Sequence, residues 1–178
     1  MKKFFTTTLA LCALAVPAHA AETAKADILG EGGDVIGQAS FVQGTVGAMM
    51  NIEVSNLPPG PHGFHIHAMG HCDTGDGFKS AHGHINPQGR AHGYLNEDGP
   101  EIGDLPNLIV HEDGTAMVQL FLPQVNISEG EGALLDEDGS ALVIHENPDD
   151  HVSQPIGGAG PRIACGVIKQ GDGAAQNE

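Results

Sequence analysis

Residues 35–57 read VIGQASFVQGTVGAMMNIEVSNL. Two runs within this stretch, 35–43 and 45–57, alternate apolar with polar residues, and Gly44 separates them. Alternation with a period of two is typical of half-buried strands, and β-branched and aromatic residues favour the same conformation. The turn-forming residues GEGGD precede the first run at 30–34. The sequence therefore predicts two neighbouring strands of an antiparallel sheet here.

Further short runs of strand character follow along the chain, and no convincing helix lies between them. With 26 Gly and 11 Pro among 178 residues, long helices are disfavoured and turns are favoured. Two long segments, 70–104 and 147–162, are rich in Gly, Pro, His and Asp and are predicted to be loops; loops of this length in a compact domain are usually functional. We expect an all-β, antiparallel sandwich or barrel. The further predicted strands are 63–67, 107–111, 115–122, 141–145 and 163–169.

Composition and charge exclude several classes of function. The chain has 7 Lys and Arg against 23 Asp and Glu, a net charge of −16. This balance argues against a nucleic-acid partner and against binding to an anionic membrane. The 11 histidines outnumber the lysines and arginines together, which directs attention to metal binding.

The first twenty residues have the organisation of a secretory signal peptide. Met1-Lys2-Lys3 is basic, residues 4–16 are apolar but too short to span a bilayer, and Ala18-His19-Ala20 is a small-x-small cleavage site. Cleavage after Ala20 removes two lysines and no acidic residue, so the net charge becomes −18. The alternative is an N-terminal core helix.

The expected mature chain, 21–178, is a single domain whose last residues, 169–178, form a frayed tail. It retains two cysteines, Cys72 and Cys165. An even pair in an exported protein predicts a disulfide.

The first indication of a metal site is Phe64-His65-Ile66-His67. Residues two apart on a strand share a face, so both imidazoles project together while Phe64 and Ile66 face the core. An HxH pair alone is weak, because a solvated strand face explains it equally well. Three more histidines and two carboxylates, with no free thiolate, favour copper or zinc over iron–sulfur or calcium chemistry. These further candidates are His84, His92, His145, Asp104 and Asp149.

Four motifs together resemble the copper/zinc superoxide dismutases in order and spacing, and more particularly the bacterial periplasmic branch. They are GFHIH at 63–67, SAHGHINP at 80–87, GDLPN at 103–107 and GPRIACGVI at 160–168. The resemblance covers about 26–168. It implies an eight-stranded antiparallel Greek-key β-barrel, with two long loops that hold the metals, in a periplasmic protein.

The resemblance also implies a role for each matching residue. Asp149 would link a copper ligand to a zinc ligand from outside both metals, and His62 would be structural. Arg162 would guide the anion to copper. His84 would bridge the two metals and carry a proton, and Cys72–Cys165 would be the disulfide. The implied copper ligands are His65, His67, His84 and His145, and the implied zinc ligands are His84, His92 and Asp104.

One position departs from the family pattern. The family has a zinc-binding histidine three residues before the matching aspartate, where this chain has Glu101. Three outcomes are open: Glu101 is an oxygen ligand, another histidine such as His82 replaces it, or zinc is lost and the protein binds copper alone. One copper per chain is expected in each case.

The implied function is superoxide dismutase: two superoxide anions and two protons become dioxygen and hydrogen peroxide by one-electron cycling of copper. The alternative is a non-catalytic periplasmic copper-binding or buffering protein. Superoxide is the expected partner, without nucleic acid or membrane, and monomer and homodimer are both open. In so acidic a protein, Lys79 or Arg90 would help Arg162 to steer the anion, unless both are ordinary solvated loop residues.

Overall fold

The computed structural model describes residues 21–172, and the predicted signal peptide lies outside the described residues. Nine strand segments and two short 3₁₀ turns make up the regular structure of this part of the chain. They are β1 (Thr23–Gly30), β2 (Val35–Gln43), β3 (Ala48–Val54), β4 (Gly60–His62), β5 (Phe64–His67), η1 (Thr74–Asp76), η2 (Lys79–Ala81), β6 (Leu108–Val110), β7 (Ala116–Leu122), β8 (Ser140–His145) and β9 (Arg162–Gln170).

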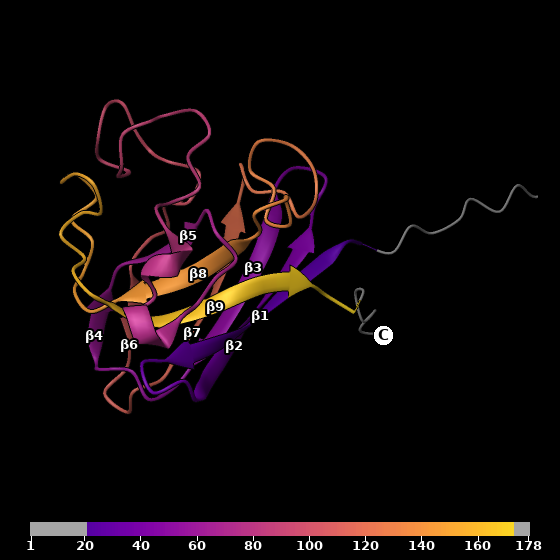
Figure 1. Ribbon diagram of the computed structural model, residues 1–178. Helices are drawn as coiled ribbons and strands as arrows, with labels where there is room; N and C mark the ends of the chain where they lie inside the picture. Colours follow the sequence, from indigo (N-terminus) through magenta and orange to yellow (C-terminus); the bar gives the residue numbers. More distant parts are fainter. Residues whose placement is uncertain (1–20, 173–178) are drawn as a thin grey trace, which may run out of the picture.

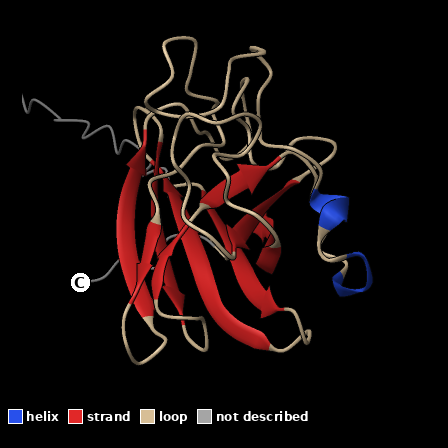
Figure 2. Ribbon diagram, turned by 90° about the vertical axis from the view of Figure 1, so that its left-hand side faces the viewer, coloured by secondary structure: helices blue, strands red, loops and turns tan. Residues whose placement is uncertain are grey.

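Seven strands form one antiparallel sheet in the order β5-β8-β9-β1-β2-β3-β7, and β4 pairs with β6. The sheet curls, with long loops gathered at one end of the strands (Figures 1 and 2). The predicted all-β antiparallel fold is confirmed. Residues 21–172 include no helix long and apolar enough to cross a bilayer.

Two strands, β1 and the short β4, were not predicted from the pattern, and β1 is the longer of them. Its inward residues Ala24, Ala26 and Ile28 are fully buried and alternate with exposed Lys25 and Asp27. Alanine is a weak strand former, so this alternation gave little signal. The strand lies at the centre of the sheet, between β2 and β9.

The alternation read from residues 35–57 sorts side chains as expected. Phe41, Met50 and Ile52 are completely buried in the main core, whereas Gln38 and Glu53, which pair across β2 and β3, face solvent. Burial of side chains of this size contributes about 1.5–3 kcal/mol each.

Strand β9 extends into the segment that was predicted to be a frayed tail. Strand β9 continues through Lys169 and Gln170, which pair with Lys25 and Ala24 of β1. The strand thus ends one residue beyond the predicted strand 163–169, and the tail prediction does not hold for Lys169 and Gln170, because the neighbouring strand β1 supplies them with ladder partners.

Candidate metal centre

The long loop reaches the strand histidines by pairing with the edge of the sheet. Strand β5 is an edge strand, so one row of its backbone groups needs other partners. Ile66 N–H donates to the Gly103 carbonyl and Ile85 N–H donates to the Ile66 carbonyl. Bridges of β type consequently align His67 with His84 and His65 with Asp104.

Three histidines from two neighbouring strands form what we term the imidazole cluster: His65 and His67 of β5, and His145 at the end of β8. Their ligand atoms lie within 4.8 Å of one another, and all three residues are at most 1% exposed. The predicted division of β5 is confirmed, because Phe64 and Ile66 pack in the main core on its other face.

One nitrogen of each ring in the imidazole cluster has a partner that fixes the ring. His67 Nδ1 donates to the His82 carbonyl (2.7 Å) and His145 Nδ1 to the Gly160 carbonyl (3.0 Å). His65 Nε2 donates to Asp149 Oδ2 at 2.8 Å. The imidazoles are therefore held in one tautomer with the other nitrogen free to bind a metal.

The other nitrogens are buried without a hydrogen-bond partner. They are His65 Nδ1, His67 Nε2, His145 Nε2 and, from the loop, His84 Nε2. Buried polar atoms normally have partners. Four free imidazole nitrogens in one place fit a copper ion, since imidazole is a preferred donor for copper. These four residues are the predicted copper set.

A second group, which we term the acidic cluster, lies on the other side of His84. It consists of His84, His92, Glu101 and Asp104, whose ligand atoms are again within 4.8 Å of one another. Asp104 Oδ1 lies 2.7 Å from His92 Nδ1 and 3.2 Å from His84 Nδ1. Two imidazoles and two carboxylates within this distance are a donor set that suits zinc.

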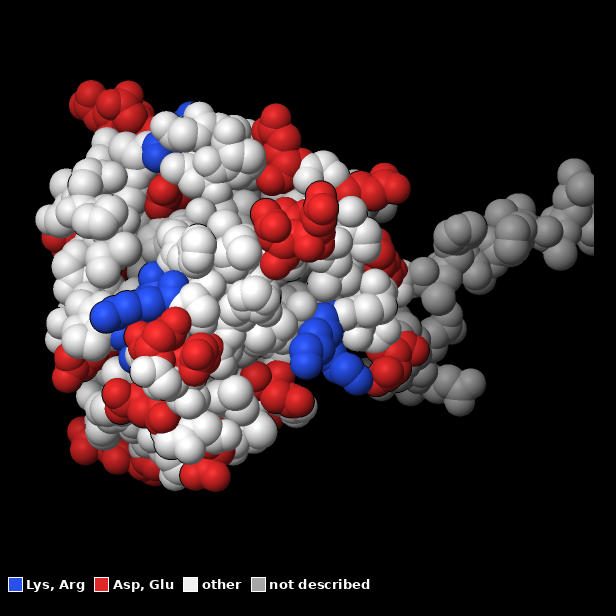
Figure 3. All heavy atoms as spheres, viewed as in Figure 1, with Lys and Arg blue, Asp and Glu red and all other residues white. Residues whose placement is uncertain are grey.

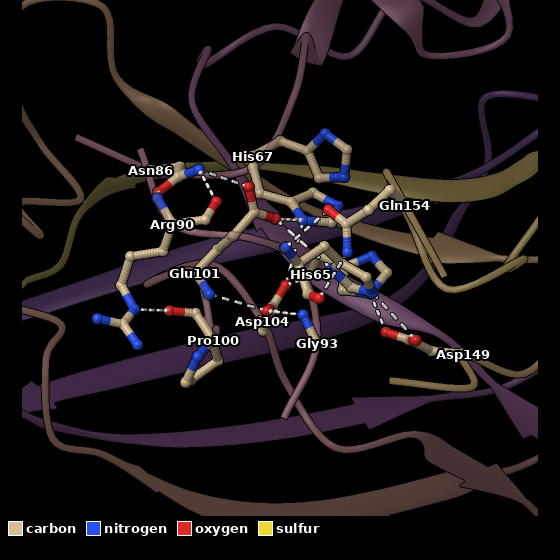
Figure 4. A network of polar contacts seen from close by, with 12 residues as sticks. His65, His67, Asn86, Arg90, Gly93, Pro100, Glu101, Asp104, Asp149 and Gln154 are labelled. Atoms are coloured by element: carbon tan, nitrogen blue, oxygen red, sulfur yellow. Dashed lines mark hydrogen bonds and ion pairs between the residues drawn. The ribbon is translucent and has the colours of Figure 1, made fainter. Parts of the chain in front are cut away.

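Glu101 points into the acidic cluster. Its Oε2 atom lies 2.6 Å from His84 Nδ1 and 3.5 Å from His92 Nδ1, and Figure 4 shows it beside Asp104. His82, the other candidate for this position, has an exposed side chain and belongs to neither cluster among the described residues.

Asp149 joins the two clusters, as the resemblance implies. Its Oδ2 accepts from His65 Nε2, and its Oδ1 lies 3.1 Å from His92 Nε2. Gly157 makes room for this carboxylate: it has a φ of 58°, and a Cβ there would lie 1.6 Å from Asp149 Oδ1. Only glycine fits so close an approach at a left-handed position.

Two asparagines support the site without having been singled out from the sequence. Asn107 binds the backbone of Asp149 twice, through its Nδ2 and Oδ1 atoms, each at 2.8 Å. Asn86 Nδ2 donates to Glu101 Oε1 at 2.7 Å. Both lie in the motifs that carry the family resemblance, and nothing else in the sequence indicates that they support the site.

Burial keeps the imidazole cluster neutral. It lowers the pKa of His65 to about 4, although the hydrogen bond to Asp149 opposes the shift. Burial, helped by repulsion from His65, lowers the pKa of His145 to about 3, and burial drives that of His67 well below its usual value. Neutral imidazole is the form that binds a metal.

The acidic cluster has the opposite electrostatics. Burial opposes protonation of His92, but hydrogen bonds to Asp104, Asp149 and Glu101 outweigh it and raise its pKa to about 11. His84 is raised in the same way, by hydrogen bonds to Asp104 and Glu101 that overcome burial. Burial acts to raise the pKa of Asp104, yet His84 and His92 hold it well below the usual range.

A recess of about 500 Å³ opens onto the junction of the clusters. Its lining includes His67, His84, Arg162 and Lys79. The Arg162 guanidinium is fixed by the carbonyl oxygens of Phe78 and His82. Two cations thus line this opening, although acidic side chains outnumber basic ones in the chain and on the face drawn in Figure 3.

Arg90 lies elsewhere. Its guanidinium donates to the carbonyl oxygens of Pro100 and Gly99, and it does not line the recess. Of the two predicted steering candidates, the geometry therefore favours Lys79.

The disulfide Cys72–Cys165 is confirmed, with a Cα–Cα distance of 5.7 Å. It ties the long loop to β9 three residues after Arg162. His62 has the structural contacts that were expected, since its ring nitrogens lie 2.8 Å and 2.7 Å from the carbonyl oxygens of His145 and Pro58. The side chains of His71 and His111 are exposed, and that of His151 is partly exposed.

A curled antiparallel sheet with two adjoining clusters of candidate metal ligands at its loop end indicates a metal-binding protein of the β-barrel class. The model of the family "Copper/zinc superoxide dismutase (SODC)" matches residues 35–168. The chain therefore belongs to the copper/zinc superoxide dismutase family.

Similar proteins agree with this assignment. Cu-Zn superoxide dismutase 1 of Aquifex aeolicus is 46% identical over 90% of this chain and 96% of its own. The Cu-Zn superoxide dismutase of Caulobacter vibrioides is also 46% identical, over 79% of this chain and 81% of its own. The crystal structure of a SOD-like protein from Bacillus subtilis superposes with a TM-score of 0.76 at 36% identity, covering 80% and 95% of the two chains.

The function is accordingly that of a superoxide dismutase, an oxidoreductase. The predicted activity is confirmed, and the alternative of a non-catalytic copper-binding protein is not favoured.

Proposed function

We propose that this chain dismutates superoxide at a copper ion held by His65, His67, His84 and His145. The observation that carries the proposal is the set of four buried imidazole nitrogens without partners. Bound copper supplies the one-electron chemistry that oxidises one superoxide to dioxygen and, with two protons, reduces the next to hydrogen peroxide. The acidic cluster would hold zinc, with Glu101 as its fourth ligand beside His84, His92 and Asp104.

Arg162 is the residue that we assign to substrate binding. Two backbone carbonyls hold its guanidinium at the recess, next to His67. A fixed cation at the mouth of a small recess attracts and orients an anion, whereas a metal-storage site has no use for one.

His84 is the residue that we assign to proton transfer. Its ring lies between the clusters, with centroids 4.2 Å from His65 and 5.2 Å from His92. Its Nδ1 is anchored by Glu101 and Asp104, while its Nε2 is free. A proton taken up at Nε2 is therefore placed where a reduced oxygen species needs it, close to the recess.

We place the protein in the periplasm. The predicted signal peptide supports this, and so does the disulfide, since such bonds persist in oxidising compartments.

The test compares residues 21–178 loaded with copper and zinc with the variant Arg162→Ala. We expect kcat/KM for superoxide to fall on the order of tenfold, because anion steering is lost, while copper per chain stays at one. Arg162→Lys should recover part of the rate. The control Lys169→Ala removes a positive charge from the same strand outside the recess and should leave the rate unchanged. Full copper loading without turnover in the unaltered protein would contradict the proposal.

A further inference from the structure

We infer that Glu101 determines the metal preference of the acidic cluster by reducing its selectivity for copper over zinc, and that Asn86 positions the carboxylate for this role. The inference rests on the proposed assignment of zinc to this cluster. It concerns the one position at which the chain departs from the family pattern of zinc ligands.

The Glu101 side chain is held inside the cluster although solvent is close by. Its side chain is 13% exposed and it lines the recess beside His84. A carboxylate with no role at such a position gains free energy by turning toward water, because burying a charge is costly without compensation. Instead Oε2 is directed at the Nδ1 atoms of His84 and His92.

Asn86 fixes this orientation. Its Nδ2 donates to Glu101 Oε1 at 2.7 Å. The asparagine is itself fixed, because its Oδ1 accepts from Arg90 N–H (2.9 Å) and its Nδ2 also donates to the Arg90 carbonyl (2.8 Å). In Figure 4 the asparagine lies on the side of Glu101 away from Asp104. Glu101 Oε1 is thus occupied and Oε2 is left for the cluster.

Backbone N–H groups also orient the neighbouring carboxylate of Asp104. Glu101 N–H donates to Asp104 Oδ2 at 2.9 Å, and Gly93 N–H donates to the same oxygen at 2.8 Å. Asp104 is left with Oδ1 for the histidines, as Glu101 is left with Oε2. Each carboxylate therefore presents one oxygen to the cluster, and each imidazole presents its Nδ1.

The donor chemistry of the two clusters then differs strongly. The imidazole cluster and His84 offer only nitrogen, which gives Cu(II) its largest advantage over other divalent ions. The acidic cluster offers two nitrogens and two carboxylate oxygens, which zinc accepts readily and which give Cu(II) a smaller advantage. A histidine at 101 would restore a nitrogen-rich set and make the two clusters compete for copper.

The experiment is a competition on the metal-free 21–178 chain. The protein is loaded with one equivalent each of copper and zinc and then titrated with Cu(II). Copper and zinc per chain are measured after desalting, and Cu(II) spectroscopy distinguishes one occupied site from two. Glu101→His is the main variant. The control is Glu112→His, which adds a histidine at an exposed turn.

We expect zinc to be displaced from Glu101→His at a copper excess on the order of tenfold lower than from the unaltered protein or the control. Glu101→Gln keeps the shape and removes the charge, and Asn86→Ala frees the carboxylate. Both should weaken zinc binding by about 10–100-fold without adding an imidazole. They also test the inference if Glu101→His does not fold.

The inference would be overturned if zinc were displaced from the unaltered protein and from Glu101→His at the same copper excess. It would also be overturned if the unaltered protein retained no zinc. Failure of the proposed function has a different signature. The unaltered protein would then fail to retain its first copper, or would retain it without consuming superoxide.

Discussion

The two ligand clusters use the same side chain in opposite electrostatic settings. The imidazole cluster is almost completely buried and has one carboxylate partner, Asp149, so burial holds its pKa values down. In the acidic cluster burial also opposes protonation, but carboxylates outweigh it and raise the pKa values of His84 and His92. The direction of the pKa shift is therefore set by the number of neighbouring acids.

This difference determines how each cluster takes up a metal. The three histidines of the imidazole cluster are neutral without a metal, so among the proposed copper ligands only His84 has a proton to release. In the acidic cluster, protons on the imidazoles balance Glu101 and Asp104, and a divalent cation must displace them. Zinc uptake should therefore depend more steeply on pH than copper uptake.

We expect the largest effect from a substitution of Asp149, because this residue contacts both clusters. In Asp149→Asn, one oxygen becomes an amide nitrogen, which cannot accept a hydrogen bond from an imidazole. We expect metal affinity to fall about 10–100-fold, for zinc as well as for copper, because the same carboxylate orients a ring of each cluster, His65 at 2.8 Å and His92 at 3.1 Å. Competition with a chelator measures both affinities.

A matched control for this substitution is Asp150→Asn. Asp150 is exposed and binds only its own turn, through Val152 and Ser153. Its substitution should leave both affinities unchanged. Equal losses in the two variants would mean that the turn, and not the link, is responsible.

Acidification should destabilise the metal-free protein through the buried histidines of the imidazole cluster. The folded pKa values of His65 and His145, about 4 and about 3, lie below the unfolded value of 6.5. Between pH 6.5 and 4 the unfolded chain therefore binds more protons, so the free energy of unfolding falls as the pH falls. We expect a loss on the order of 1 kcal/mol per pH unit for each of the two histidines.

Urea unfolding at pH 7 and pH 5 in the presence of a chelator measures this slope. His145→Gln removes one of these buried groups and should flatten the slope, whereas His111→Gln, at an exposed position, should not. The acidic cluster works in the other direction: the pKa of His92, about 11, lies above the unfolded value, so its contribution is lost as the pH rises above 6.5. A free energy of unfolding independent of pH from 5 to 7 would contradict the assignment.

The smallest expected effect concerns the recess. Lys79 lines it together with Arg162 and His67. Lys79→Ala should lower the rate with superoxide severalfold at low ionic strength, and less at high salt, because exposed charges are screened. Arg90→Ala, which alters no residue of the recess lining, should keep the salt dependence of the unaltered protein. The reverse result would transfer the steering role to Arg90.

Much of the fold could be predicted because local pattern and burial agree. The alternation in β2 and β3 states directly which side chains are buried, and these strands lie within their predicted bounds. In β5 both faces are buried, and the alternation separates core residues from metal-ligand candidates. Strand β1 escaped because its buried face includes two alanines, Ala24 and Ala26. Its place at the centre of the sheet is decided by ladders to β2 and β9, and its partners on β9 are too far along the chain to leave a local signal.

The amino-acid sequence by itself determined the chemistry available: five histidines and three carboxylates that can bind or orient metals, an arginine for an anion and two cysteines for one disulfide. Only the tertiary structure decided how these groups are divided. The uncovered edge of β5 draws His84 and Asp104 beside His65 and His67, and Asn86 turns Glu101 inward. A metal site requires ligand atoms within a few ångströms of one another. Here those atoms belong to residues far apart along the chain, and they come together only when the long loop pairs with the sheet edge.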